Sequence, residues 1–410
     1  MTTTVVVVFC VVYLGMILGG LPFLQLDRTG VALLGAIALI STGAVSLDEA
    51  AASIHLPTLI LLFAFMVVSA QMRLGGFYDW VTRRLAGYAL APPLLLGAVI
   101  FVIAGLSAVF SNDIVCLAVA PVLIDACRGR RFDCVPFLLG LACAANIGSA
   151  ATLIGNPQNM LIGQSLHMSF PRYLADAFVP VLLGLLVTWG LIVWQTGGCW
   201  VREDGVAQDI PERRVDEMKL DRWQTAKGLA VAGTLLVAFL FTSWPREHAA
   251  LTGAGLLLMS RKLHSSKMLG LVDWELLILF IGLFVVNHAL QQTDLVPQAI
   301  ANLAAHGVSL DQPAPLFGTV FVLSNVLSNV PAVMLLLPAA HTALAGTLLA
   351  LVSTLAGNLF IVGSIANIIV VDAAARRGIR IDWRRHAATG VPVTLATLAI
   401  CAGYFWIRGS

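Results

Sequence analysis

The sequence predicts an all-α polytopic membrane protein made of two inverted repeats, each with five spans plus one re-entrant helical hairpin and a broken helix. Hydrophobic residues make up 59% of the 410-residue chain and charged residues only 11%, whereas soluble proteins carry about 25% charged residues. Apolar runs of roughly 18 residues or more recur along the chain, as membrane-spanning helices require. A Ser-Asn motif lies inside an apolar run twice, at Ser111-Asn112 and at Ser328-Asn329, which indicates two related halves.

The first half, residues 1–197, opens with three apolar segments that predict membrane spans. These lie at about 4–22, 29–46 and 57–72. Because no basic flank precedes the first segment, it is interpreted as a span rather than as a cleaved signal peptide. The partly polar stretch 73–90 follows, and its arginines predict a helix at the membrane interface.

The segment 91–127 is apolar except at its middle, where Ser111-Asn112-Asp113 lies. Its second arm, 114–127, is shorter than the roughly 20 residues that cross a bilayer as a helix. Both ends of the segment are rich in arginine, so we expect a re-entrant hairpin that enters and leaves on one side. A broken span at 134–168 and a span at about 175–197 complete the first half.

The second half, residues 223–410, repeats the order of the first half after a charged linker at 198–222. Its expected elements are spans at about 223–243, 247–261 and 274–291, a stretch at 292–311, a second hairpin at 312–343, a broken span at 345–372 and a last span at about 387–407.

Small and polar residues interrupt both broken spans. The first is expected to break around Asn146 and again at Gly155-Asn156-Pro157-Gln158-Asn159, and the second at Gly357-Asn358 and Gly363-Ser364-Ile365-Ala366-Asn367. Non-helical backbone at membrane depth persists only inside protein or beside water. Inverted repeats with broken helices are typical of secondary transporters, whose sites lie near the midplane. We therefore expect the two hairpin tips and the two breaks to surround one site.

Equal sequence intervals support the repeat. An interval of 217 residues separates Ser111 from Ser328, and the same interval separates Pro121 from Pro338. Three further pairs match at nearby intervals: Arg28 with Arg246 at 218, Gly155 with Gly363 at 208, and Asn159 with Asn367 at 208. The interval changes as loops change length, as expected after duplication.

The distribution of basic residues predicts the topology, because cytoplasmic loops carry an excess of Lys and Arg. With both termini outside, only Arg172, Arg246 and Arg408 of the 24 Lys and Arg residues fall outside. The linker at 198–222 is then cytoplasmic. Since each half has an odd number of spans, the halves are inverted relative to each other.

Polar residues at the tips and breaks are the candidate substrate- and ion-binding residues. Ser111-Asn112-Asp113 precede a helix and can serve as its cap, but their burial at midplane favours a ligand role. Asp113 is an ionisable residue at membrane depth, which is a functional candidate by default; its counterpart in the repeat is Val330. The full set is Ser111, Asn112, Asp113, Asn146, Thr152, Gly155, Asn156, Asn159, Ser328, Asn329, Asn358, Gly363, Ser364 and Asn367.

Other polar residues are interpreted as structural. Asn287 and His288 lie toward the end of a span and are expected to be packed, while Cys116 and Cys143 are expected to be small core residues. The sequence contains no catalytic triad, zinc motif, phosphate loop or nucleotide motif. We therefore expect no enzyme activity, no cofactor, no metal site apart from a coupling sodium at the tips, and no nucleic-acid partner.

At these residues the chain resembles the ion transporter superfamily, in particular its citrate-transporter-like and arsenite-pump-like permeases. The resemblance rests on Ser111-Asn112-Asp113 with Pro121, on Ala145-Asn146-Ile147-Gly148 through Asn159, on Ser328-Asn329-Val330-Pro331 with Pro338, and on Gly363 through Asn367. It implies scaffold spans at 4–72 and 223–291, transport parts at 91–197 and 312–407, elevator-like alternating access and a homodimer.

The tips depart from one branch of this superfamily. Its dicarboxylate members carry Ser-Asn-Thr at both tips, whereas here Asp113 and Val330 replace the threonines. The resemblance therefore favours a small anion or oxyacid substrate, such as arsenite, another inorganic anion or a carboxylate, with proton coupling preferred to sodium. A sodium/proton antiporter and a passive anion channel are the alternatives. The expected location is the cytoplasmic or inner membrane.

Overall fold

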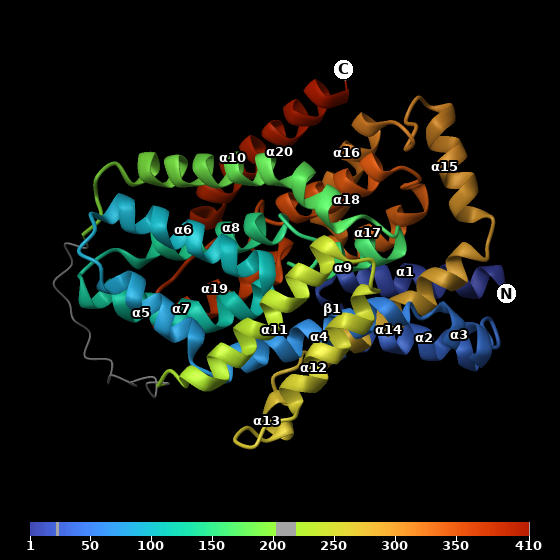
Figure 1. The fold of residues 1–410 in the computed structure, drawn as a ribbon. Helices are drawn as coiled ribbons and strands as arrows, with labels where there is room; N and C mark the ends of the chain where they lie inside the picture. Colours follow the sequence, from blue (N-terminus) through green and yellow to red (C-terminus); the bar gives the residue numbers. More distant parts are fainter. Residues whose placement is uncertain (22–23, 202–218, 410) are drawn as a thin grey trace.

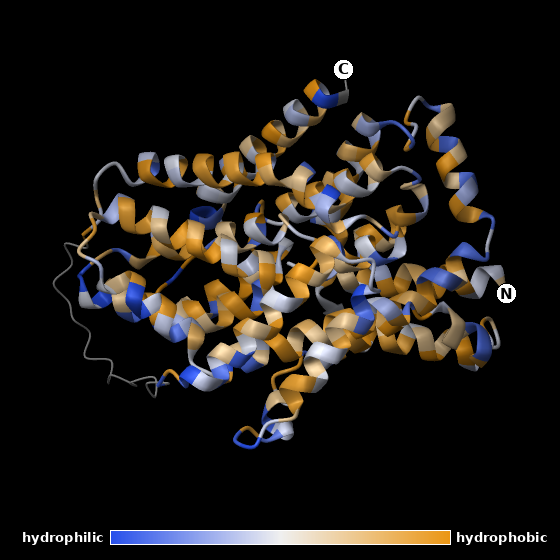
Figure 2. Cartoon of the chain, viewed as in Figure 1, coloured by the Kyte–Doolittle hydropathy of each residue, from blue (hydrophilic) through white to orange (hydrophobic). Residues whose placement is uncertain are grey.

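The computed structural model of this chain describes residues 1–21, 24–201 and 219–409. Within these residues the fold is helical apart from one small hairpin of strands β1 (Gly20–Leu21) and β2 (Leu26–Asp27), which pair antiparallel. Six of the described helices are long and apolar enough to cross a membrane, and several shorter helices are also apolar. Figure 2 shows hydrophobic residues along most of the helices and hydrophilic residues mainly at helix ends and loops.

The first half contributes ten helices within the described residues. They are α1 (Thr2–Leu18), α2 (Arg28–Ser41), α3 (Leu47–Ser53), α4 (Leu56–Leu74), α5 (Phe77–Gly87), α6 (Pro92–Val109), α7 (Asn112–Gly129), α8 (Cys134–Ser149), α9 (Pro157–Ser165) and α10 (Phe170–Thr196).

The second half follows the same order. Its described helices are α11 (Arg222–Phe241), α12 (Arg246–Leu258), α13 (Ser265–Leu269), α14 (Trp274–Gln291), α15 (Leu295–Ala305), α16 (Pro313–Leu327), α17 (Asn329–Leu336), α18 (Ala343–Ala356), α19 (Ile365–Ala375) and α20 (Trp383–Gly409), with 3₁₀ turns η1 (Leu337–Ala339) and η2 (Ile361–Gly363).

Capping side chains fix where the helices around the breaks begin. The Asn156 side chain accepts a hydrogen bond from the Asn159 amide at the start of α9, and Ser364 accepts one from the Ala366 amide at the start of α19. A side-chain oxygen at this position satisfies one of the free amides of the first turn. The polar residues that interrupt the apolar runs therefore start new helices inside the protein.

Helices of one half pack against helices of the other half in matching pairs. Helix α2 packs against α14, and its counterpart α12 packs against α4. Within each half, α6 packs against α8 and α16 against α18, while α10 packs against α20 across the halves (Figure 1). The hairpins and broken helices thus pack against one another and against α10 and α20. A second packed group consists of α1, α2, α4, α11, α12 and α14, and it contacts the first through pairs such as α4 with α9.

Charged contacts define the two ends of the helical body. At one end, Arg377 pairs with Asp125 and Arg385 with Asp133, and Arg130 donates to the carbonyl of Tyr88. The last contact joins the chain just before α6 to the chain just after α7, so the first hairpin returns to the end where it began. At the other end Arg408 pairs with Asp176.

The all-helical architecture with several apolar helices of membrane length is confirmed, and three local features differ from the expectation. Asn146 does not interrupt a span, because it lies inside the continuous helix α8, and its side chain bonds to residues of the first tip and of the second break rather than to freed backbone. The second arm of the first hairpin is the 18-residue helix α7, longer than expected. The helices α3 and α13 and the β-hairpin were not expected. Most of the linker at 198–222 lies outside the described residues.

Candidate functional site

Asn146 on α8 is the centre of a buried hydrogen-bond network that joins both halves. Its Nδ2 donates to Oδ1 of Asn358 at 2.8 Å and to Oδ1 of Asn367 at 3.1 Å. Its Oδ1 accepts from the Ser364 hydroxyl at 2.8 Å and from Nδ2 of Asn112 at 3.3 Å. One amide on α8 therefore holds the first hairpin tip against the break of the second half.

Thr354 on α18 is the centre of a second buried network, which joins the second half to the break of the first half. Its hydroxyl accepts from Nδ2 of Asn156 and from Nε2 of Gln158, both at 3.2 Å. It also lies 3.4 Å from Oδ1 of Asn159, whose Nδ2 donates to the hydroxyl of Tyr173 at 3.1 Å. A hydroxyl of the second half therefore holds the break of the first half.

The two networks are counterparts. The interval of 208 residues that relates Asn159 to Asn367 also relates Asn146 to Thr354, and Asn156 to Ser364. Each central residue contacts the capping residue and the asparagine of the opposite half, as the hydrogen bonds above describe. Thr354 and Gln158 are absent from the residues expected at the site, although this interval could have identified Thr354.

Several buried amide atoms at the centre have no hydrogen-bond partner. These atoms are Oδ1 of Asn112, Oδ1 of Asn329 and Nδ2 of Asn358. All three side chains are less than a tenth exposed. Because an unsatisfied buried polar group costs about 1–3 kcal/mol, atoms left free from both hairpin tips and one break point to a ligand that completes them.

Close backbone contacts hold the first tip against its break. The Asn112 amide donates to the Gly155 carbonyl at 3.3 Å, and the Thr152 hydroxyl donates to the Ala108 carbonyl at 2.5 Å. A Cβ on Gly155 would lie 2.2 Å from the Ser149 carbonyl oxygen, so only glycine fits there. Thr152 and Gly155 therefore position the site rather than line it.

The second tip meets the second break through glycines. Nδ2 of Asn329 lies 3.0 Å from the position that a Cβ on Gly357 would take, and a Cβ on Gly363 would lie 3.0 Å from the Gly357 carbonyl oxygen. Ser328 itself has a positive φ of 79°, in a region that strongly favours glycine. The chain is thus tightly folded where this tip approaches Asn358.

Asp113 and Ser111 face the group of α1, α2, α4, α11, α12 and α14. The Ser111 amide donates to the Ser69 hydroxyl on α4 at 3.4 Å. Asp113 is partly buried, interacts electrostatically with Asp273 at the start of α14, and lies in the first turn of α7, where the helix dipole favours a negative charge. The carboxylate is therefore adjacent to the asparagine network but is not part of it.

Residues interpreted as structural are packed as expected. Asn287 accepts from the Tyr13 hydroxyl at 2.8 Å and donates to the Leu283 carbonyl. Cys116 and Cys143 are buried. Among the described residues, no group of three or more His, Cys, Asp or Glu side chains could hold a metal ion.

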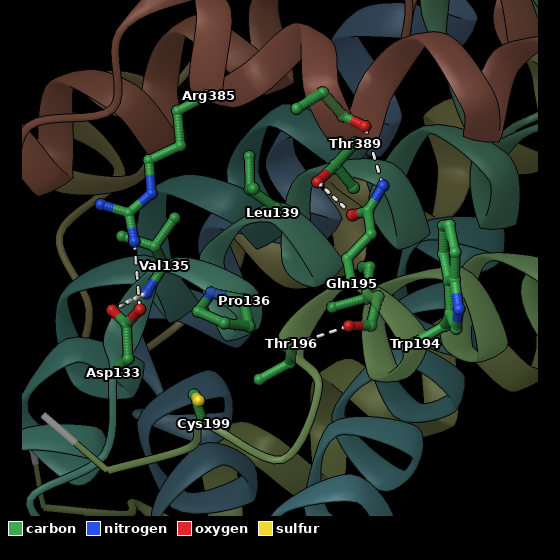
Figure 3. Close-up of a pocket in the computed structure, with 12 residues that line it drawn as sticks. Asp133, Val135, Pro136, Leu139, Trp194, Gln195, Thr196, Cys199, Arg385 and Thr389 are labelled. Atoms are coloured by element: carbon green, nitrogen blue, oxygen red, sulfur yellow. Dashed lines mark hydrogen bonds and ion pairs between the residues drawn. The ribbon is translucent and has the colours of Figure 1, made fainter.

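A large cavity lies away from this network. Figure 3 shows it between α8, α10 and α20, with the Arg385–Asp133 ion pair on one side and the Gln195–Thr389 hydrogen bond on the other. Its volume is about 740 Å³, and none of the residues expected at the site lines it. The side chains that bond to Asn146 are each less than a tenth exposed.

Apolar helices of membrane length around a polar centre built from two broken helices define a membrane transport protein. A family model for the citrate transporter, CitMHS, matches residues 5–356, which is most of the chain. The chain therefore belongs to the citrate transporter family, as the tip and break motifs indicate.

Curated relatives align over nearly the whole chain. A protein from Oryza sativa subsp. japonica named silicon efflux transporter LSI3 is 31% identical over 470 residues, covering 96% of this chain and 95% of the relative. A protein from Dictyostelium discoideum named putative transporter arsB is 22% identical, covering 92% and 87%. The inner membrane protein YbiR of Escherichia coli K12 is 29% identical, covering 82% and 84%.

Family membership and fold together establish the kind of protein. It is a multi-pass membrane protein and a secondary transporter of the citrate/arsenite transporter family, and it is not an enzyme.

Proposed function

We propose that this transporter carries a small oxyacid with free hydroxyl groups, bound between the two hairpin tips and coupled to protons through Asp113. The observation that carries the proposal is the buried network around Asn146, which leaves the Oδ1 atoms of Asn112 and Asn329 and the Nδ2 atom of Asn358 without partners.

The chemistry of the free atoms favours a hydroxylated oxyacid over a carboxylate such as citrate. Two free carbonyl oxygens accept hydrogen bonds and one free amide donates them, and a hydroxyl group can satisfy both kinds. A fully ionised carboxylate is an acceptor only and would meet the two oxygens unfavourably. No Lys or Arg takes part in the hydrogen bonds of the network among the described residues. The rice relative is named for silicon, whose dissolved form is such a hydroxylated acid.

Proton coupling is supported by the surroundings of Asp113. This carboxylate lies one residue from Asn112, and its electrostatic neighbour is another acid, Asp273. An ionisable residue at membrane depth is expected to act in ion or proton movement. Protonation of Asp113 on one side of the membrane and release on the other would link substrate movement to the pH gradient.

Alternating access through inverted repeats is supported by the exchange of partners between the halves. Helix α8 begins beside the end of α10, where Asp133 and Thr196 line one cavity, whereas α18 begins beside the start of α10, where Thr342 and Arg172 line another. Counterpart helices that start at opposite ends of α10 are what inversion requires. We propose that α6–α10 and α16–α20 move as one body against the remaining helices, in a homodimer with both termini outside.

Transport by purified protein in liposomes tests this function. Silicic acid, arsenite and citrate are offered separately with an inward or outward pH gradient, with and without sodium. We expect a hydroxylated acid to accumulate against its gradient on the pH gradient alone. Accumulation of citrate in preference to silicic acid and arsenite would contradict the proposed substrate class. Accumulation that requires sodium would show that sodium, and not the proton, is the coupling ion.

The same liposomes separate a carrier from a channel. A carrier concentrates the solute, whereas a channel only equalises it. Labelling of single cysteines in the loops at Arg130 and at Gly378 tests the topology, because both loops are expected on the cytoplasmic side. Labelling of either from outside would overturn the inverted arrangement.

A further inference from the structure

Arg246 joins the moving body to the helices beside it. It is the first residue of α12, and its Nη2 atom donates to the carbonyls of Gly163 at 3.0 Å and Met168 at 2.7 Å. Both carbonyls lie at or just after the C-terminal end of α9. The Gly163 carbonyl also accepts from the Met168 amide at 3.1 Å, so the arginine adds a second donor to it. The helix dipole at this end favours a cation. The neighbouring pair Gln164–Glu247, at 3.2 Å, closes the same junction.

Every part of this junction has a counterpart in the other half. Arg28 matches Arg246 at an interval of 218, and each is the first residue of its helix, α2 and α12. Thr29 then corresponds to Glu247. The interval of 208 that relates α9 to α19 makes Asp372 the counterpart of Gln164.

The counterpart junction is not formed in this structure. Among the described residues Arg28 has no hydrogen bond or ion pair, and Thr29 donates to the Glu275 carbonyl instead. Asp372 pairs with Arg376 on its own helix, and that pair is largely exposed. Helix α9 packs against α4, whereas the counterpart helices α19 and α14 share no comparable packing in the described part of the chain.

We propose that Arg28 binds the C-terminal end of α19 when the transport body has moved to its other position, as Arg246 binds the end of α9 here. The inference rests on the proposed alternating access. The two arginines then act as paired latches, one for each end state, and this structure has the Arg246 latch closed. Because each latch opens when the other closes, their balance sets the populations of the two states.

Paired cysteines distinguish the two states, in a background where the exposed Cys10 and Cys199 are replaced by serine. Gln164→Cys with Glu247→Cys reports the closed latch seen here, and Thr29→Cys with Asp372→Cys reports the proposed one. We expect a short bifunctional thiol reagent to cross-link both pairs in liposomes, with substrate and pH gradients raising one yield as they lower the other.

Variants of Arg28 and Arg246 test whether the two latches set the populations of the two end states. Arg246→Gln should raise cross-linking of the Thr29/Asp372 pair, Arg28→Gln should lower it, and each should shift the ratio of states by roughly tenfold, as loss of a charge-assisted hydrogen bond predicts. The double variant should return the ratio to that of the parent. Arg172→Gln, which removes a charge near the Arg246 latch, serves as the control.

One result would overturn the latch and a different one the proposed function. If the parent concentrates solute and the Gln164/Glu247 pair cross-links, but the Thr29/Asp372 pair never does under any gradient, the Arg28 latch is wrong. If the parent concentrates no solute while both pairs cross-link, the latches hold and the proposed coupled transport is wrong.

Discussion

The two hairpin tips carry the same Ser-Asn motif in different backbones. Ser111 precedes α7 with φ −54° and ψ 124°, an ordinary extended conformation. Ser328 precedes α17 with φ 79° and ψ 160°, which costs a non-glycine residue about 1–3 kcal/mol. The first tip is therefore relaxed and carries Asp113, whereas the second is strained and carries Val330. Strain of this kind persists only where the surroundings hold it in place.

The helices behind the tips also differ, although each has a proline ten residues after its serine. Helix α7 continues through Pro121 for 18 residues, whereas α17 ends after 8 residues and passes into η1 at Pro338. Proline removes a backbone donor and clashes with the preceding turn, so either outcome is allowed locally. The surroundings of the two helices differ: α7 packs against α5, α8 and α19, whereas α17 packs against α16 and α18 and is buried along nearly its whole length.

Under the proposed function, the two tips share the positions that bind the ligand, and only the first tip carries an ionisable side chain. Asn112 and Asn329 each leave one buried Oδ1 free, so both tips are equipped to bind. The ionisable residue is at the first tip, beside Asp273. Variants of the two tips should therefore have similar effects on binding and different effects on coupling.

The largest difference is expected from Asp113→Asn. This change keeps the size and the capping ability of the side chain but removes its titration, so accumulation on a pH gradient should fall to equilibrium. In the parent, each unit of pH can support up to about tenfold accumulation per coupled proton. The matched variant Val330→Asn should retain accumulation. Liposome uptake measures both, and full accumulation by Asp113→Asn would make Asp113 a structural cap.

The second-largest difference is expected between Asn146 and Thr354, the two residues at the centres of the networks that hold the breaks. Asn146→Ala should lower the free energy of unfolding by about 3 kcal/mol, because several buried partners lose their hydrogen bonds. Thr354→Ala should lower it by about 1–2 kcal/mol. Thermal unfolding in detergent gives both values. A larger loss for Thr354→Ala would place the centre of the site in the other half.

Asn112→Ala and Asn329→Ala should each weaken substrate binding by about tenfold, the equivalent of roughly 1.4 kcal/mol for one hydrogen bond to the ligand. Equilibrium binding to purified protein measures the affinities. A shared site predicts comparable losses from the two tips, so a loss confined to one tip would break the symmetry of binding.

The smallest effect is expected from the tip serines. Ser328→Gly should stabilise the protein by up to about 1 kcal/mol, because glycine adopts a positive φ without strain. Ser111→Gly should destabilise it by about 0.5–1 kcal/mol, because the folded backbone there favours no glycine and the unfolded chain gains freedom. Opposite signs in thermal unfolding would confirm the difference between the tips.

The sequence by itself determined the helices, the breaks and the tip motifs. Apolar runs determine where helices lie in a membrane. Asn156 and Ser364 mark where α9 and α19 begin, because their side chains cap these helices. Each of these signals is local. For the same reason the candidate site residues at the tips and breaks could be named before any contact was known. The structure joins four of them, Asn112, Asn358, Ser364 and Asn367, to Asn146, and two others, Asn156 and Asn159, to Thr354.

Only the tertiary structure decided how the halves interlock. Asn146 was expected at a break, yet it lies inside α8, and its amide is satisfied by Asn112 of the first tip and by Asn358, Ser364 and Asn367 of the second break. The role of Thr354 and the Arg246 junction depend on residues about 200 and 80 positions away along the chain. Side-chain hydrogen bonds between helices follow from how packed helices face each other, and local sequence patterns do not encode that geometry.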